Sequence, residues 1–180
     1  MPTPEPLPSL VSPDDLASYP GAPFTQGEID NASATVRSWA GWHIAPERNE
    51  TVTVETEGGR RAIMLETLHL SAVTAVRDVT HAGHTAVLTD LPTHPTARFR
   101  AGILSRRSGW PCGAVEITFT HGHATCPAEL RAVIAEVIRG DRRLGELRSR
   151  TLGDRSESWR DHLTTSSQST VQTFRILRSR

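Results

Sequence analysis

The sequence predicts an α+β fold, in which a small helical bundle carries an inserted β-rich region. Two stretches with helical spacing of apolar residues lie at 25–40 and 127–139, and a shorter helix is expected at 13–18. Between them, residues 51–120 contain alternating polar and apolar residues, which is the strand period. Both ends are poor in apolar residues, so we expect extended termini around one core in this chain of 180 residues.

Proline occupies every second position of the first segment, at Pro2, Pro4, Pro6 and Pro8. This pattern predicts an extended, mobile, polyproline-like arm over residues 1–11, with a binding arm as the alternative. The rest of the chain is expected to form one domain over 12–150, with the β-rich region 51–120 inserted in it, and a Ser/Thr/Arg-rich segment over 151–180.

Two of the expected helices have start signals that involve proline. In "SPDDLASY", Ser12 can cap the helix 13–18 and Pro13 occupies its first position. In "CPAELRAVIAEV", Pro127 takes the same place in the helix 127–139. Gly140 is expected to end or bend this helix.

The helix 25–40 has the most complete set of boundary signals. Thr25 and Glu28 have the spacing of a capping box, and Phe24 and Ile29 that of a hydrophobic staple. Gly41 can end the helix in a left-handed conformation. The apolar faces of this helix and of 127–139 are expected to form the core, with Ile29, Val36, Trp39, Leu130, Val133, Ile134 and Val137.

The β-rich region contains one expected hairpin and two further strand patterns. Residues 51–57 alternate, and Gly58-Gly59 after them predicts a hairpin turn into the following stretch 60–66. Another strand is expected at 68–79. In "GAVEITFTHG" the residues Val115, Ile117 and Phe119 share one face, which predicts a strand buried on one side.

Charge is unevenly distributed along a chain whose formal net charge is zero. Residues 1–57 carry nine acids and two arginines, a net charge of −7, whereas residues 127–180 carry seven acids and eleven arginines, a net charge of +4. This polarity suits head-to-tail contacts between copies of the chain. A dedicated DNA-binding domain would be strongly basic throughout.

No stretch approaches the length of apolar sequence that a membrane span requires, and residues 1–10 lack the basic and apolar regions of a signal peptide. The two cysteines are therefore expected to be free thiols in a reducing compartment.

A cysteine–histidine set offers an alternative, enzymatic interpretation. Cys112, His121, His123 and Cys126 are ligand types that zinc accepts, in the spacing C-x8-H-x-H-x2-C, but the spacing fits no familiar zinc motif. A strand exit and a helix start explain the same residues. A small zinc- or thiol-dependent enzyme thus stays open as the first alternative, as does a disulfide between the cysteines.

Arginine clusters at 105–110 and 139–150 leave a non-specific DNA-binding module as the second alternative. No nucleophile elbow G-x-S-x-G and no phosphate-binding G-x-x-x-x-G-K-[ST] is present in the sequence. The sequence therefore favours no catalytic residues and no cofactor.

The ordered motifs resemble the head-to-tail connector (adaptor) proteins of long-tailed bacteriophages, the actinobacteriophage type in particular. The resemblance rests on "SPDDLASY", "IDNASATVRSWAGW", "HLSAVTAVRDV", "GAVEITFTHGHATCPAELRAVIAEV" and "RSRTLGDRSESW", over roughly residues 12–160. The proline-rich start and the last residues depart from the family pattern.

The resemblance implies a structural virion protein and not an enzyme. Its members form a homo-oligomeric ring of about twelve subunits at the neck, below the portal protein. The ring extends the channel for double-stranded genomic DNA, without sequence-specific binding. It also forms a platform for the next head-closure, stopper or tail-terminator protein. Localisation would be the virion neck, after synthesis in the host bacterial cytoplasm.

The segment 151–180 has too few apolar residues for a core of its own. We expect it to dock on the portal or on a neighbouring subunit through Trp159, Phe174, Arg175, Ile176, Leu177, Arg178 and Arg180.

Overall fold

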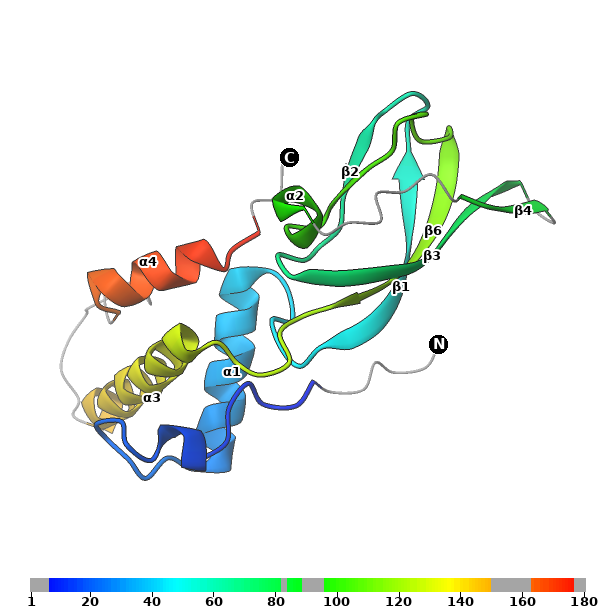
Figure 1. Cartoon of the computed structure of the whole chain (residues 1–180). Helices are drawn as coiled ribbons and strands as arrows, with labels where there is room; N and C mark the ends of the chain where they lie inside the picture. Colours follow the sequence, from blue (N-terminus) through cyan, green and yellow to red (C-terminus); the bar gives the residue numbers. More distant parts are fainter. Residues whose placement is uncertain (1–6, 82–83, 89–95, 150–162, 177–180) are drawn as a thin grey trace. The chain divides into compact units, whose positions relative to one another are not determined.

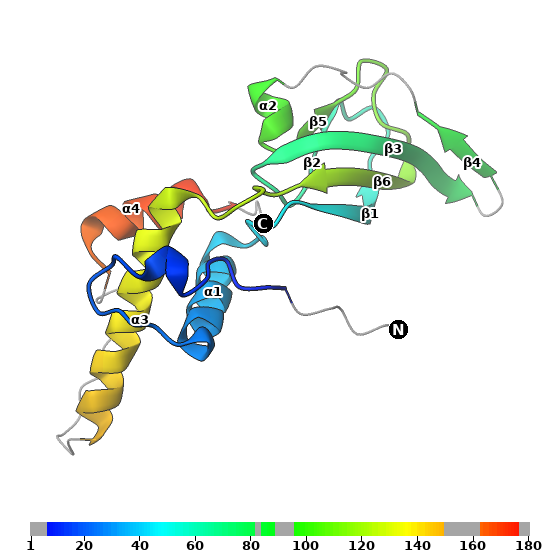
Figure 2. The same ribbon diagram turned by 60° about the horizontal axis from the view of Figure 1, so that its bottom comes forward.

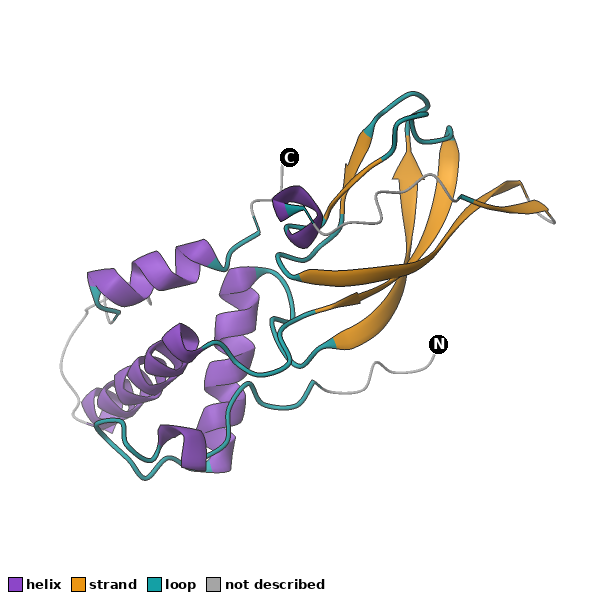
Figure 3. Ribbon diagram, viewed as in Figure 1, coloured by secondary structure: helices purple, strands orange, loops and turns teal. Residues whose placement is uncertain are grey.

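The computed structural model describes residues 7–81, 84–88, 96–149 and 163–176. It divides the chain into two compact units, one of residues 1–46 and 125–180 and one of residues 47–124. The first is helical and the second is built on β-strands, which confirms the α+β class (Figures 1 and 3). The expected boundaries of the β-rich insert, 51–120, fall within the second unit.

The described residues of the helical unit form a short 3-10 helix and three α-helices, drawn from two views in Figures 1 and 2. These elements are η1 (Asp14–Leu16), α1 (Gln26–Ala40), α3 (Ala128–Ser149) and α4 (Thr165–Thr173). Helix α3 packs against η1, α1 and α4, and α4 also contacts α1. Three segments distant in sequence therefore share one helical core.

Helix α1 begins and ends as its sequence indicates. Thr25 and Glu28 form the complete capping box, and both residues of the expected staple, Phe24 and Ile29, are buried. Gly41 ends the helix with φ of 79°, the left-handed conformation that a residue without Cβ adopts at little cost.

Helix α3 differs from its expected length. It continues through Gly140 to Ser149, so the prediction of an end at that glycine is wrong. Contacts of the later turns compensate for the weak helix propensity of glycine, because Arg142 binds the loop before α1 and Glu28 of α1.

The core of the helical unit contains six of the seven side chains assigned to it from the sequence. The buried ones are Ile29, Val36, Leu130, Val133, Ile134 and Val137. Trp39 is only half-buried, and Trp42, two residues after the end of α1, is the buried tryptophan of this region at 7% exposure. The chain leaves the helix at Gly41, which brings Trp42 inward.

In the β unit, the residues that the structure describes form a four-stranded antiparallel sheet in the order β1-β6-β3-β4 and a two-stranded sheet of β2 and β5. Their bounds are β1 (Arg48–Thr56), β2 (Ala62–Met64), β3 (Leu70–His81), β4 (His84–Val87), β5 (Ile103–Ser105) and β6 (Gly113–His121), with the short helix α2 (Ala97–Arg100) before β5. Strand β6 is buried on the face of Val115, Ile117 and Phe119, as its alternation predicts.

The turn at Gly58-Gly59 does not close a hairpin between β1 and β2. Strand β1 pairs with β6, and β2 pairs with β5. Backbone hydrogen bonds from Gly59 N–H to Trp110 C=O and from Trp110 N–H to Arg60 C=O hold the turn against the loop before β6 instead. The two glycines form a turn, as the sequence predicts, but β1 and β2 on either side of it pair with strands that are distant in sequence.

Candidate functional site

The C-terminal segment, assigned to partner docking from the sequence, folds in part onto its own chain. Within the described residues it forms α4, which the sequence did not predict, and it continues to Ile176. Trp159, Leu177, Arg178 and Arg180 lie outside the described residues. Phe174 is half-buried, Arg175 is exposed and Ile176 is 7% exposed.

A carboxylate of α3 holds the first turn of α4. Glu136 accepts hydrogen bonds from the Thr164 backbone N–H at 2.6 Å, from the Thr164 hydroxyl at 3.3 Å and from the Ser167 hydroxyl. Thr164 also caps α4 by accepting from the Ser167 N–H. A negative group at this position stabilises a helix, because the first N–H groups have no partner within the helix.

The last turn of α4 is fixed to the residues that follow α1. The Trp42 indole Nε1–H donates to the Phe174 carbonyl at 2.8 Å, and the Ile176 N–H donates to the Ala40 carbonyl at 2.9 Å. Val171 and Ile176 supply the buried apolar side chains. The exposed side of this segment carries polar side chains only: Thr165, Ser166, Gln168, Ser169, Gln172, Thr173 and Arg175.

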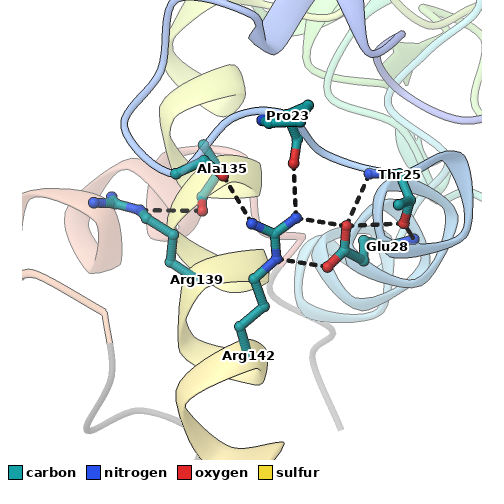
Figure 4. A network of polar contacts seen from close by, with 7 residues as sticks. Pro23, Thr25, Glu28, Ala135, Arg139 and Arg142 are labelled. Carbon is teal, nitrogen blue, oxygen red and sulfur yellow. Dashed lines mark hydrogen bonds and ion pairs between the residues drawn. The ribbon is translucent and has the colours of Figure 1, made fainter. Parts of the chain in front are cut away.

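Arg142 of α3 forms the densest set of polar contacts in the helical unit (Figure 4). Its guanidinium donates to both carboxylate oxygens of Glu28, from Nε at 2.6 Å and from Nη2 at 2.8 Å. It also donates to the carbonyls of Gly21 and Pro23 and lies 5.1 Å from the centre of the Phe24 ring. One side chain thus fixes the second half of α3 to the start of α1.

The Arg142 guanidinium, with the Thr25 backbone N–H, lowers the pKa of Glu28 to about 2. The same carboxylate raises the pKa of Arg142. The Asp15 carboxylate accepts from Ser12 and lies 3.4 Å from Arg131, which together lower its pKa. Part of the expected charge polarity is therefore neutralised inside one chain, because N-terminal acids pair with arginines of α3.

The cysteine–histidine set contains residues with partners of other kinds. His121 is buried and its Nε2 lies 2.8 Å from Glu50 Oε2, which also accepts from Arg48. Burial lowers the pKa of His121 and outweighs the opposite effect of Glu50, so the imidazole is neutral at neutral pH. The ring of His123 stacks with His69 at 4.1 Å between centroids.

The two cysteines are free thiols, which contradicts the open alternative of a disulfide within this structure. Cys112 is exposed in the β unit, whereas Cys126 is buried in the helical unit and burial raises the pKa of its thiol to about 11. Such a thiol is a poor nucleophile. Among the described residues, no group of three or more His, Cys, Asp and Glu side chains could hold a metal ion.

The arginine clusters are partly engaged by their own chain. Arg106 donates to the Gly109 carbonyl at 2.9 Å, and Arg139 donates to the Ala135 carbonyl at 3.3 Å. Arg107 and Arg143 are exposed. Over the ranges that the structure describes, no helix is long and apolar enough to cross a membrane.

Sequence reasoning missed Glu136, Trp42 and Arg142 as the residues that position α4 and α3. Each acts on a segment far away in sequence, so no local pattern identifies these residues.

No protein-family model and no curated protein sequence matches the chain. Solved structures do match its fold. A chain in the neck of an empty GTA particle, computed with C6 symmetry, superposes with a TM-score of 0.59 at 15% identity, over 95% of both chains. A chain in the virion of the native gene transfer agent (GTA) particle gives 0.60 at 14% identity, also over 95% of both chains.

A third match is a chain in the neck of the native GTA particle, computed with C12 symmetry. It has a TM-score of 0.58 at 17% identity and covers 86% of this chain and 82% of the other. The likeness spans both units and establishes a shared fold for nearly the whole chain.

Proposed function

We propose that this chain is a structural subunit of the neck of a phage-like particle and forms the adaptor ring below the portal. The observation that carries the proposal is the likeness to chains of GTA particles over 95% of both chains, which includes the helical unit and the β unit together. Two of the matching structures are necks with sixfold or twelvefold symmetry. A cyclic ring of this chain, of about twelve copies, is the corresponding assembly.

The role is one of assembly and requires no catalytic residue, metal or cofactor. Supporting observations are the neutral, hydrogen-bonded His121 and the poorly nucleophilic Cys126, which lack the features of an active site. The partners would be further copies of the chain, the portal protein, the next connector, and genomic double-stranded DNA that passes through the channel. The virion neck would be its location, after synthesis in the host cytoplasm.

The docking segment is proposed to be the exposed side of α4 with Arg175. Ile176 packs into its own helical unit, so we assign it the role of an anchor rather than that of a partner contact. The polar, exposed side chains that follow Thr164 suit a rim contact with a protein partner. Trp159, Leu177, Arg178 and Arg180 remain proposals from the sequence.

Electron microscopy of the full chain, alone and with the portal protein of the same genome, tests this function. We expect cyclic rings, or rings bound to the portal. If the chain stays monomeric at every concentration tested and does not bind the portal, the proposed function is contradicted. Arg175→Ala should weaken portal binding more than Gln172→Ala, an exposed substitution on the same segment.

A further inference from the structure

Strand β1 forms one edge of the four-stranded sheet, and its outer side has no strand beside it among the described residues. It pairs with β6 over nine residues in an unbroken register from Arg48↔His121 to Thr56↔Gly113. An edge strand leaves alternate backbone N–H and C=O groups unpaired, which makes it a template for a further strand.

Strand β1 lacks several features that protect sheet edges, and its charged residues, Arg48, Glu50 and Glu55, lie outside its centre. It contains no proline and no bulge, and its centre, Thr51 to Val54, is uncharged and made of residues with high strand propensity. At the other edge, β4 has only four residues and the register of its pairing with β3 shifts. The unprotected edge is therefore β1.

The proline-rich arm has the strand period in its sequence. Pro2, Pro4, Pro6 and Pro8 recur every second residue, whereas a polyproline helix repeats every third. Because successive N–H groups of a strand point to opposite edges, all four prolines would share one edge and Thr3, Glu5 and Leu7 would offer N–H groups at the other. Such a strand pairs on one side only and blocks further addition on its other side.

The base of the arm is held on α1. The Pro8 carbonyl accepts from Arg37 at 2.7 Å, and the Leu10 N–H donates to the Ser33 hydroxyl at 3.1 Å. The Leu7 side chain is 39% exposed. The six residues before Leu7 can reach about 20 Å when extended, against about 30 Å for the nine-residue β1, so one arm can cover most of the edge.

We propose that the arm, residues 1–7, of one copy pairs as an additional strand with β1 of a neighbouring copy. The inference rests on the proposed ring, in which every copy offers one arm and one open edge and each is used once around the circle. The prolines then occupy the outer edge, where they prevent an open-ended sheet. Backbone hydrogen bonds supply the attraction, which suits an arm with few apolar side chains.

Hydrogen exchange of β1 in the assembled full chain tests the pairing with two matched variants. Thr3→Pro with Glu5→Pro removes N–H groups from the pairing edge, and we expect the outward amides of residues 48–56 to exchange about tenfold faster than in the wild type. Pro4→Ala with Pro6→Ala keeps the protection but unblocks the outer edge, so larger species should appear in light scattering. Equal exchange of these amides in the wild type and the Thr3/Glu5 variant overturns the proposal. It would mean either that nothing covers the edge of β1 or that a strand other than the arm covers it.

Spin labels identify which copy donates the arm. In a Cys112→Ser background, which removes the exposed thiol, one batch carries Thr3→Cys and another carries Thr53→Cys. A short label-to-label distance in the mixed assembly supports donation between copies. In a control, both labels are placed on one chain, which is diluted with unlabelled protein. If a short distance appears only in this sample, each arm binds its own β1 and the proposal is overturned.

The same variants distinguish this inference from the proposed function. Rings on the portal with an unprotected β1 would leave the adaptor role intact and remove the arm pairing. Protection of β1 by the arm of another copy, without portal binding, would support the arm pairing and contradict the adaptor role.

Discussion

At the residue scale, Arg142 shows how one side chain can join two helices that are distant in sequence. Its planar guanidinium satisfies both oxygens of Glu28 and two carbonyls of the preceding loop at once, a geometry that a lysine ammonium cannot reproduce. The contact joins residues 114 positions apart. It stabilises the later turns of α3 beyond Gly140, where local propensity favours an end.

The Glu28–Arg142 pair gives stability a defined pH dependence. The folded pKa of Glu28 is about 2 against an ordinary value of 4.5, so its stabilisation is complete above about pH 4.5 and is lost as pH falls towards 2. Both side chains are about a third exposed, and solvent screening limits the effect to roughly 1–2 kcal/mol. Urea denaturation at pH 7 and pH 3 should show a larger loss of unfolding free energy in the wild type than in Glu28→Gln, which still contains other carboxylates with a lowered pKa, such as Asp15.

Glu55→Gln serves as the control, since it removes an exposed carboxylate in the β unit. If Glu28→Gln loses as much stability on acidification as the wild type does, the ion pair does not contribute.

Substitutions at two glycines of the β unit can distinguish the cost of backbone strain from the cost of a steric collision. Gly102 has φ of 77°, and a Cβ there would lie 2.5 Å from the Thr67 carbonyl oxygen and 2.9 Å from that of Leu65. Gly59 has φ of 82° with open space around it. Gly102→Ala should therefore cost about 3 kcal/mol of unfolding free energy and Gly59→Ala about 1 kcal/mol. Equal losses in urea titrations would show that φ alone sets the cost.

At the element scale, the sequence predicted elements better than it predicted their partners. The caps of α1 and the one-sided burial of β6 follow from residues within a few positions of each other, so local chemistry suffices. The pairing of β1 with β6 and the docking of α4 depend on contacts such as Trp42 with Phe174, which no local pattern contains. The candidate docking segment was located from composition, but its inward anchor, Ile176, was not.

Helix α4 has a single buried apolar side chain within its bounds, Val171, so its docking depends strongly on polar contacts. Glu136→Gln keeps the shape of the side chain but removes the charge at the start of α4. We expect amides of α4 to exchange about fivefold faster, with little change in global stability, because charge at a helix start is worth about 1 kcal/mol. Glu129→Gln in the first turn of α3 is the matched control.

In the Glu136→Gln experiment, hydrogen exchange resolved to single amides separates the outcomes. Faster exchange confined to residues 165–173 supports a detachable helix. Equal acceleration throughout α1 and α3 would instead show that α4 unfolds only together with the helical unit.

At the scale of the whole molecule, the distribution of charge bears on how copies would associate. The charge polarity of the sequence suits head-to-tail contacts between an acidic start and a basic end of neighbouring copies. The structure pairs Asp15 with Arg131 and Glu28 with Arg142 inside one chain, so these groups are already neutralised before any copy meets another. Association through backbone hydrogen bonds at β1 needs no net charge.

Self-association should therefore depend only weakly on salt. Raising NaCl from about 0.1 M to about 0.5 M shortens the screening length and weakens contacts between exposed charges, while internal pairs and backbone hydrogen bonds change little. In sedimentation velocity we expect the association constant to fall by less than about tenfold. A loss of a hundredfold or more would mean that exposed arginines such as Arg107 and Arg143 meet acidic side chains of a neighbour, and that charge, rather than strand pairing, holds the assembly together.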